Sequence, residues 1–187
     1  MLLLAAAVMM MLTACKDKKQ TNENIITTDY EIPKPSEAPV VMGATTDRAD
    51  AEWVEGRHYT VTVTREAADS LPKVTDEIGQ KYVDNIVRVK VMRADSTVFF
   101  NRSFTKSAFV GWLDSDYRKN ALLEGIRFLK ADGDSLVFVA WLNYPQSGDD
   151  EAVELLLTIG RNAEVNIQNY SENDRDDLEQ MDQEEEP

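Results

Sequence analysis

The chain has 187 residues, of which 20 are basic, 34 are acidic, one is His and one is Cys, and its formal net charge at pH 7 is −14. This length suits one folded domain with terminal extensions. The net charge argues against a nucleic-acid partner, because phosphate binding needs a basic face, and one Cys with one His excludes a disulfide framework and a zinc site of several thiolates or imidazoles.

An apolar run opens the chain and ends in the single cysteine. Residues 1–12 are almost entirely apolar; such a run is too short to cross about 30 Å of hydrocarbon as a helix but is typical of the core of an export signal. The run leads into Leu12-Thr13-Ala14-Cys15, which resembles a bacterial lipobox. The resemblance implies a signal peptide over residues 1–14 and a lipid anchor on Cys15, although the Lys or Arg with which such a signal normally begins is absent from the residues before Cys15. The alternative is a buried N-terminal helix with an ordinary cysteine.

Residues 15–52 are predicted to be the lipidated cysteine and a flexible tether. Three prolines, Pro33, Pro35 and Pro39, favour extended backbone, and large apolar residues are few. The segment Lys16-Asp17-Lys18-Lys19 begins like the acidic surface-export signal of some Bacteroidota lipoproteins, but its lysines break that pattern. We therefore expect an exported protein held at the periplasmic face of the outer membrane in preference to the cell surface.

Seven segments of residues 53–170 alternate apolar and polar side chains or are rich in β-forming residues, which predicts strands. Short turns join most neighbouring segments, so these neighbours must run antiparallel. The predicted strands are His58–Arg65, Asn85–Arg93, Thr97–Phe104, Leu122–Lys130, Leu136–Tyr144, Val153–Ile159 and a last strand around Val165 and Ile167.

One interior stretch, residues 105–123, lacks this alternation. Ala108, Phe109, Trp112 and Leu113 recur there at helical spacing. Residues 136–142 are apolar on both faces and must be covered on both sides, and residues 105–123 are the predicted cover. We therefore predict a single, mainly β domain over residues 53–170. It is an antiparallel meander of about seven or eight strands that forms a small barrel or sandwich with one or two short helices.

The negative charge lies mostly outside this domain. Residues 171–187 contain nine acidic residues and one basic residue, whereas residues 53–170 contain 17 acidic and 14 basic residues. A run of like charges repels itself when it is compacted, so residues 171–187 are predicted to be an acidic disordered tail. The alternative is an acidic tail that binds a partner.

A series of short motifs in residues 53–170, together with the sequence around Cys15, resembles a known family. The motifs are Leu71-Pro72-Lys73-Val74 leading to Gly79, Tyr82, Asp84 and Asn85; Phe99-Phe100-Asn101-Arg102-Ser103-Phe104-Thr105-Lys106 with Phe109; Leu136-Val137-Phe138; and Tyr144-Pro145. These residues are similar to those of small Bacteroidota lipoproteins that carry a domain of unknown function. The resemblance brings no activity with it.

Three Asp-Ser pairs resemble the O-glycosylation pattern of proteins exported in this bacterial group. They are Asp69-Ser70-Leu71, Asp95-Ser96-Thr97 and Asp134-Ser135-Leu136, which makes Ser70, Ser96 and Ser135 candidate glycosylation sites. The alternative is structural, because Asp-Ser is a common turn pair.

The sequence contains no recognisable catalytic constellation. His58 opens a strand on its polar face, and no Gly-x-Ser-x-Gly elbow, phosphate-binding loop or His-Glu-x-x-His helix is present. We therefore predict no catalytic residue, metal or other cofactor. The alternative class is an envelope hydrolase with paired carboxylates, which would need a cleft with two facing acids, at least one of them with a perturbed pKa.

Aromatic residues are the better candidates for binding, because Trp and Tyr combine apolar area with a hydrogen-bonding tip. Arg102 lies on the same face of its strand as Phe100 and Phe104, so it lies either at an open position or against a buried carboxylate.

The lipid signal, the tether and the lack of a catalytic constellation together predict a membrane-tethered, non-enzymatic accessory domain. An apolar pocket at Trp141 or Phe138 would favour a small apolar ligand, and an exposed aromatic strip would favour an envelope protein. The candidate contact residues are Trp112, Tyr117, Trp141, Tyr144 and Arg102.

Overall fold

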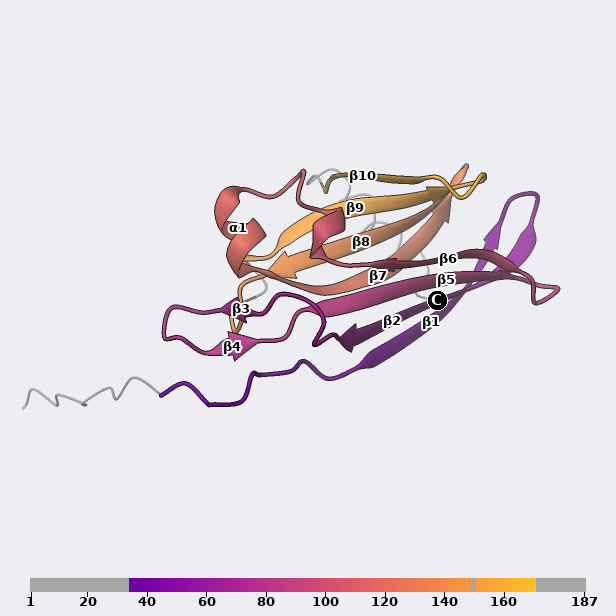
Figure 1. Ribbon diagram of the computed structural model, residues 1–187. Coiled ribbons are helices and arrows are strands. Elements are labelled where there is room, and N and C mark those ends of the chain that lie inside the picture. Colours follow the sequence, from indigo (N-terminus) through magenta and orange to yellow (C-terminus); the bar gives the residue numbers. More distant parts are fainter. Residues whose placement is uncertain (1–33, 149–150, 171–187) are drawn as a thin grey trace, which may run out of the picture. The chain divides into compact units, whose positions relative to one another are not determined.

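The computed structural model describes residues 34–148 and 151–170 (Figure 1). The predicted signal peptide, Cys15, the first part of the predicted tether and the acidic tail lie outside these residues. The described elements are β1 (Thr45–Trp53), β2 (Arg57–Ala67), β3 (Val74–Thr75), β4 (Lys81–Tyr82), β5 (Asn85–Arg93), β6 (Val98–Phe104), the 3₁₀ helix η1 (Lys106–Ala108), α1 (Ser115–Asn120), β7 (Leu122–Asp132), β8 (Ser135–Asn143), β9 (Val153–Gly160) and β10 (Val165–Asn169).

Two four-stranded antiparallel sheets form the domain, and a two-stranded sheet, β3-β4, accompanies them (Figure 1). The strand orders are β1-β2-β5-β6 and β10-β9-β8-β7, and every pairing between neighbouring strands is antiparallel. Buried side chains from both sheets make one hydrophobic core. The mainly β prediction is therefore confirmed, and the sheets form a sandwich and not a closed barrel.

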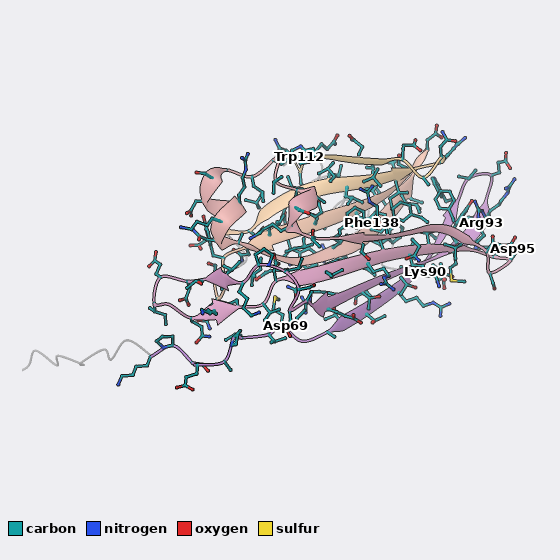
Figure 2. The ribbon with its side chains drawn as sticks, viewed as in Figure 1. Asp69, Lys90, Arg93, Asp95, Trp112 and Phe138 are labelled. Carbon is teal, nitrogen blue, oxygen red and sulfur yellow. The ribbon has the colours of Figure 1, made fainter. Side chains whose placement is uncertain are left out.

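The core follows from the period-two pattern of the strands. Val87, Val89 and Val91 of β5 are completely buried, while Arg88 between them is exposed. From the other sheet, Phe138 of β8 reaches the same core and is also fully buried. Figure 2 shows Phe138 between the two sheets. Because burial of one such side chain contributes about 1.5–3 kcal/mol, this shared apolar layer is what holds the sheets together.

The folded domain begins before residue 53, which corrects the predicted boundary. Strand β1 pairs with β2 over nine positions, from Thr45↔Arg65 to Trp53↔Arg57. Ala51 and Trp53 are buried in the core, and the Trp53 indole donates a hydrogen bond to the Gly133 carbonyl at 3.1 Å. The last part of the predicted tether is therefore an edge strand of the sandwich.

The segment ahead of β1 also docks on the domain. Val40 forms a parallel bridge with Tyr82, in which the Val40 amide donates to the Lys81 carbonyl at 2.8 Å and the Val83 amide donates to the Val40 carbonyl at 2.9 Å. The buried side chain of Gln80 donates from Nε2 to the Ala38 carbonyl at 3.2 Å. Residues 36–40, which we call the strap, are thus held against β4.

The stretch predicted to be helical is divided in two. The 3₁₀ helix η1 and the helix α1 are separated by a turn, and Asp114 caps α1 by accepting hydrogen bonds from the amides of Asp116 at 2.8 Å and Tyr117 at 2.9 Å. Phe109 and Leu113 are buried in the core, as expected for a segment that covers the sheet. Trp112, between them, is 41% exposed.

A buried polar network joins β5, β7 and η1. Asp84 Oδ1 accepts from the backbone amides of Asn85 at 2.8 Å and Leu123 at 2.9 Å. Lys106 Nζ lies 3.9 Å from Asp84 Oδ2 and donates to the Ala121 carbonyl at 2.6 Å. Burial raises the pKa of the Asp84 carboxyl, although its two amide donors and Lys106 oppose this change. Burial likewise lowers the pKa of the Lys106 ammonium.

The raised pKa of Asp84 predicts a pH dependence of stability. The folded state binds this proton more tightly than the unfolded state, so the stabilisation that comes from proton binding to Asp84 is present below its ordinary pKa of 3.8 and is lost as the pH rises through the folded value. Relative to Asp84→Asn, which does not titrate, the wild-type unfolding free energy should fall between acidic and neutral pH. Urea titrations of both proteins across this range measure the two unfolding free energies. A wild-type value that rises with pH relative to that of Asp84→Asn would contradict the prediction.

Candidate functional site

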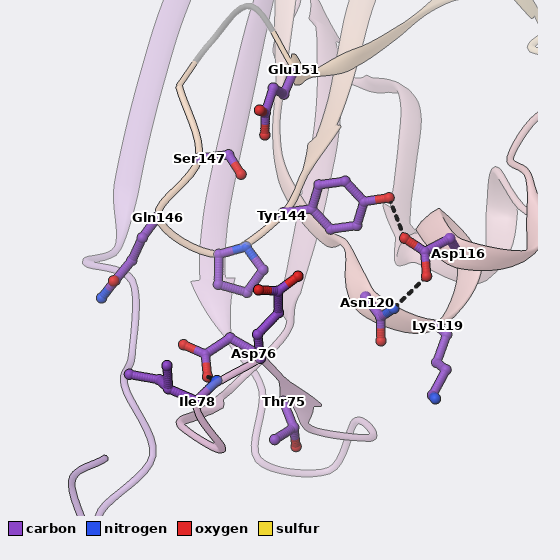
Figure 3. A pocket seen from close by; sticks show the side chains of 12 residues that line it. Thr75, Asp76, Ile78, Asp116, Lys119, Asn120, Tyr144, Gln146, Ser147 and Glu151 are labelled. Atoms are coloured by element: carbon purple, nitrogen blue, oxygen red, sulfur yellow. Dashed lines mark hydrogen bonds between the residues drawn. The ribbon is translucent and has the colours of Figure 1, made fainter. Parts of the chain in front are cut away.

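A cleft of about 720 Å³ lies where α1, the β3–β4 connection and the loop after β8 meet (Figure 3). Most of its lining residues are polar in type, although polar and apolar atoms contribute about equally to its surface, and its side chains come from three parts of the chain that are distant in sequence. The lining residues are Thr75, Asp76, Glu77, Ile78, Asp116, Lys119, Asn120, Tyr144, Pro145, Gln146, Ser147 and Glu151.

The β3–β4 wall of the cleft is organised around Asp76. Its Oδ1 accepts from the backbone amides of Ile78 at 3.1 Å and Gln80 at 2.8 Å, and its Oδ2 accepts from the Tyr82 hydroxyl at 3.1 Å. Burial, followed by the hydrogen bond to Asp76, raises the pKa of the Tyr82 phenol. Asp76 therefore holds this connection in shape, because both of its oxygens are engaged within the domain.

Two tyrosines join the opposite walls. The Tyr144 hydroxyl donates to Asp116 Oδ2 at 2.5 Å, and the Tyr117 hydroxyl donates to the Glu151 carbonyl. The two rings pack with centroids 4.4 Å apart. Asn120 Nδ2 donates to Asp116 Oδ1 at 2.7 Å, so both oxygens of Asp116 are engaged (Figure 3). These contacts fix the Tyr144 ring between α1 and the loop after β8.

Burial and nearby carboxylates raise the pKa of both phenols and keep them protonated. The hydrogen bond to Asp116 is the main cause that raises the pKa of Tyr144, and burial adds to it. Burial is the main cause that raises the pKa of Tyr117, and nearby carboxylates reinforce it. Both hydroxyls therefore serve as hydrogen-bond donors at neutral pH and not as bases.

Other lining side chains remain available to a ligand. Within the described part of the chain, the side chains of Glu77, Lys119 and Gln146 make no hydrogen bond or ion pair. Gln146 has a positive φ of 66°, which is uncommon for a residue other than glycine, and the adjoining loop is held by a hydrogen bond from Asn143 Nδ2 to the Gly148 carbonyl at 3.0 Å. The cleft thus combines a braced aromatic side chain with acceptor, donor and amide groups that have no partner among the described residues.

The structure brings two of the five predicted contact residues together. Tyr144 lines the cleft and Tyr117 packs behind it. Trp112 is exposed at the margin of the domain but is not among the residues that line the cleft (Figure 2). Arg102 is exposed on edge strand β6, with its guanidinium 5.4 Å from the centre of the Phe104 ring, so it occupies the open position of the two alternatives.

Trp141 packs over a glycine instead of lining the cleft. A Cβ added at Gly125 would lie 2.2 Å from Trp141 Cζ2, so the indole lies directly over the backbone of β7. Phe138 is fully buried and packs against Phe128 with ring centroids 5.3 Å apart. These two positions are filled by packing, and the cleft of Figure 3 lies elsewhere.

The three candidate glycosylation residues differ in access. Ser70 and Ser96 are exposed in turns, and Ser96 has a positive φ of 65°. Ser135 is half-buried as the first residue of β8, where it pairs with both Asp132 and Gly160. Modification of all three remains a prediction, and exposure favours Ser70 and Ser96.

The cleft differs from the paired-carboxylate site of the hydrolase alternative. Asp84, the carboxyl group whose pKa burial raises, is held in the buried polar network and does not line the cleft.

Among residues 34–148 and 151–170, no group of three or more His, Cys, Asp or Glu side chains is placed to hold a metal ion. No helix in the described residues is both long and apolar enough to span a membrane.

The fold and the cleft define a two-sheet antiparallel β-sandwich with a polar cleft beside its short helix. Residues 25–167 match the family model described as Domain of unknown function (DUF4738), and the chain belongs to this family. The match begins well before residue 53, in agreement with the inclusion of the strap and β1 in the domain. A comparison with curated proteins finds no match.

Proposed function

We propose that the chain is an exported, lipid-anchored accessory protein whose β-sandwich binds a ligand or partner segment through the cleft of Figure 3. The observation that carries the binding role is the cleft itself, in which fixed and unengaged polar side chains from three chain segments converge. The lipobox-like Leu12-Thr13-Ala14-Cys15 supports the anchor, and the periplasmic face of the outer membrane is the proposed location.

Binding is favoured over hydrolysis by the state of the cleft carboxylates. Two of the four carboxylates that line the cleft, Asp76 and Asp116, accept hydrogen bonds on both oxygens, which suits a structural role better than proton transfer to a substrate. The lining combines charged and amide groups with apolar atoms in about equal parts, which favours a ligand with polar groups over the wholly apolar small ligand considered from the sequence. An envelope protein remains within the proposal if it presents a polar segment to the cleft.

Replacement of the predicted anchor residue gives a direct test of export and lipidation. In the native host, Cys15→Ala should move the protein from the membrane fraction to the soluble fraction and abolish incorporation of a labelled fatty acid, because acyl chains supply the membrane affinity. Lys18→Ala is the matched control and should leave both properties unchanged. Membrane retention of Cys15→Ala without label would contradict the proposed anchor.

A photo-crosslinking amino acid placed in the cleft tests the binding role. At position 146, on the rim of the cleft, it should yield an adduct with a cell-envelope component in living cells. At position 168, an exposed glutamine of β10 outside the cleft, it should not yield that adduct. Mass spectrometry identifies the adduct, and equal adducts at the two positions, or none at position 146, would contradict the proposed site.

A further inference from the structure

We infer that the ligand of the cleft is a saccharide, either uncharged or carrying amino groups. This inference rests on the proposed binding function and adds the chemical class of the ligand. It follows from the charge of the lining, from the hydrogen-bonding capacity that the domain leaves unused there, and from the braced ring of Tyr144.

The lining excludes two common ligand classes. Ile78 and Pro145 are the aliphatic residues among the twelve that line the cleft, and polar atoms make up about half of the lining, so a lipid or another wholly apolar ligand would leave many polar groups unpaired. Among the described residues, four carboxylates and a single ammonium group, that of Lys119, line it, so a phosphate or an acidic ligand would meet net repulsion. The remaining ligands are polar and are neutral or cationic.

The three cleft side chains without a partner among the described residues, those of Glu77, Lys119 and Gln146, suit ligand hydroxyls better than ligand groups that can only donate or only accept a hydrogen bond. Glu77 offers only acceptors, Lys119 offers only donors, and the Gln146 amide offers both. A sugar hydroxyl donates and accepts at once, so adjacent hydroxyls can satisfy all three side chains. Hydrogen bonds to the two charged groups would be the stronger ones. Amino groups on the sugar would add attraction to the carboxylates.

The aromatic wall supplies the apolar contact that a sugar ring also needs. Tyr144 is held by Asp116 and by packing on Tyr117, so its ring requires little further ordering when a ligand binds. Pro145 follows it directly and lines the same cleft (Figure 3). The volume of about 720 Å³ lies within the range of small-molecule sites and leaves room for more than one sugar ring.

The test uses the full mature chain on an array of neutral, amino-bearing and acidic oligosaccharides, followed by calorimetric titration with the strongest binder. Gln146→Ala and Lys119→Ala should each weaken binding about tenfold, the effect of losing one good hydrogen bond. Gln168→Ala and Arg88→Ala, which remove the same kinds of group from exposed positions on β10 and β5, should leave the affinity unchanged. Unchanged circular dichroism spectra confirm that the variants fold.

Each result decides the inference. Binding of neutral or amino-bearing sugars that falls only in the cleft variants supports it. No binding, equal loss in the control variants, or equally tight binding of acidic sugars would overturn it. A protein adduct at position 146 together with a blank array would overturn the saccharide inference while leaving the proposed cleft function intact.

Discussion

Asp84→Ala should lower the free energy of unfolding by about 3 kcal/mol, because removal of one partner from a buried ion pair leaves the other uncompensated. The Asp84 and Lys106 side chains are 5% and 15% exposed, so water cannot fully replace the lost interaction. The change also leaves the amides of Asn85 and Leu123 without their acceptor. Urea denaturation at neutral pH measures the loss, with an unchanged m value showing that the same surface unfolds.

Two further variants separate the buried pair from an ordinary surface pair. Asp134→Ala breaks an ion pair with Arg161 in which both side chains are more than half exposed, and it should cost less than about 1 kcal/mol. Asp84→Asn combined with Lys106→Met removes both charges together and should cost less than Asp84→Ala. A loss in Asp84→Ala no larger than in Asp134→Ala would show that the network does not stabilise the domain.

Gly125→Ala should destabilise the domain by about 2 kcal/mol, because the new methyl group occupies space that the Trp141 ring already fills. The indole would have to leave the surface of β7, exposing apolar area. The unfolding free energy should therefore fall, and the tryptophan emission of the folded protein should shift to longer wavelength. Chemical denaturation followed by fluorescence measures both effects.

The matched glycine is Gly111, where an added Cβ meets nothing within 4 Å. Gly111→Ala should leave stability within about 0.5 kcal/mol of the wild type. In a Trp141→Ala background the cost of Gly125→Ala should largely disappear, since the ring that opposes the methyl group is absent. A full cost in that background would show that another neighbour is responsible.

Strands whose alternate residues are buried were predictable from sequence. The bounds of β5 agree with the prediction, because Val87, Val89 and Val91 alternate with polar residues along the whole strand. Edge strand β1 was missed for the opposite reason. It buries only Ala51 and Trp53, and its other positions are polar or small and largely exposed, so it has no clear apolar period. Strands β3 and β4 have two residues each, which is too short to show any period.

The cleft was predictable only in part. Tyr144 stood out because an aromatic residue precedes a loop rich in Gly, Ser and Asp. Asp76 and Asn120 carried no comparable signal, since their importance arises from hydrogen bonds within their own walls, to Tyr82 and to Asp116. The walls come from around residues 76, 118 and 146, and single-sequence periodicity does not report which loops meet in space. Trp141 was a misleading candidate because a buried glycine, not a ligand, accommodates its ring.

The strap gives the domain a defined response to pulling. Tension on the chain ahead of residue 34 would load the Gln80 side chain and the two backbone bonds beside Val40 before it reached β1. Rupture of those bonds would release residues 36–40, roughly 17 Å of extended chain, while Met42 and Gly43 stayed bonded to Asn85 and Arg65 and β1 stayed paired with β2. Residues 36–40 would then detach from β4 under tension before the sandwich unfolds, and they could bind β4 again when the tension is removed.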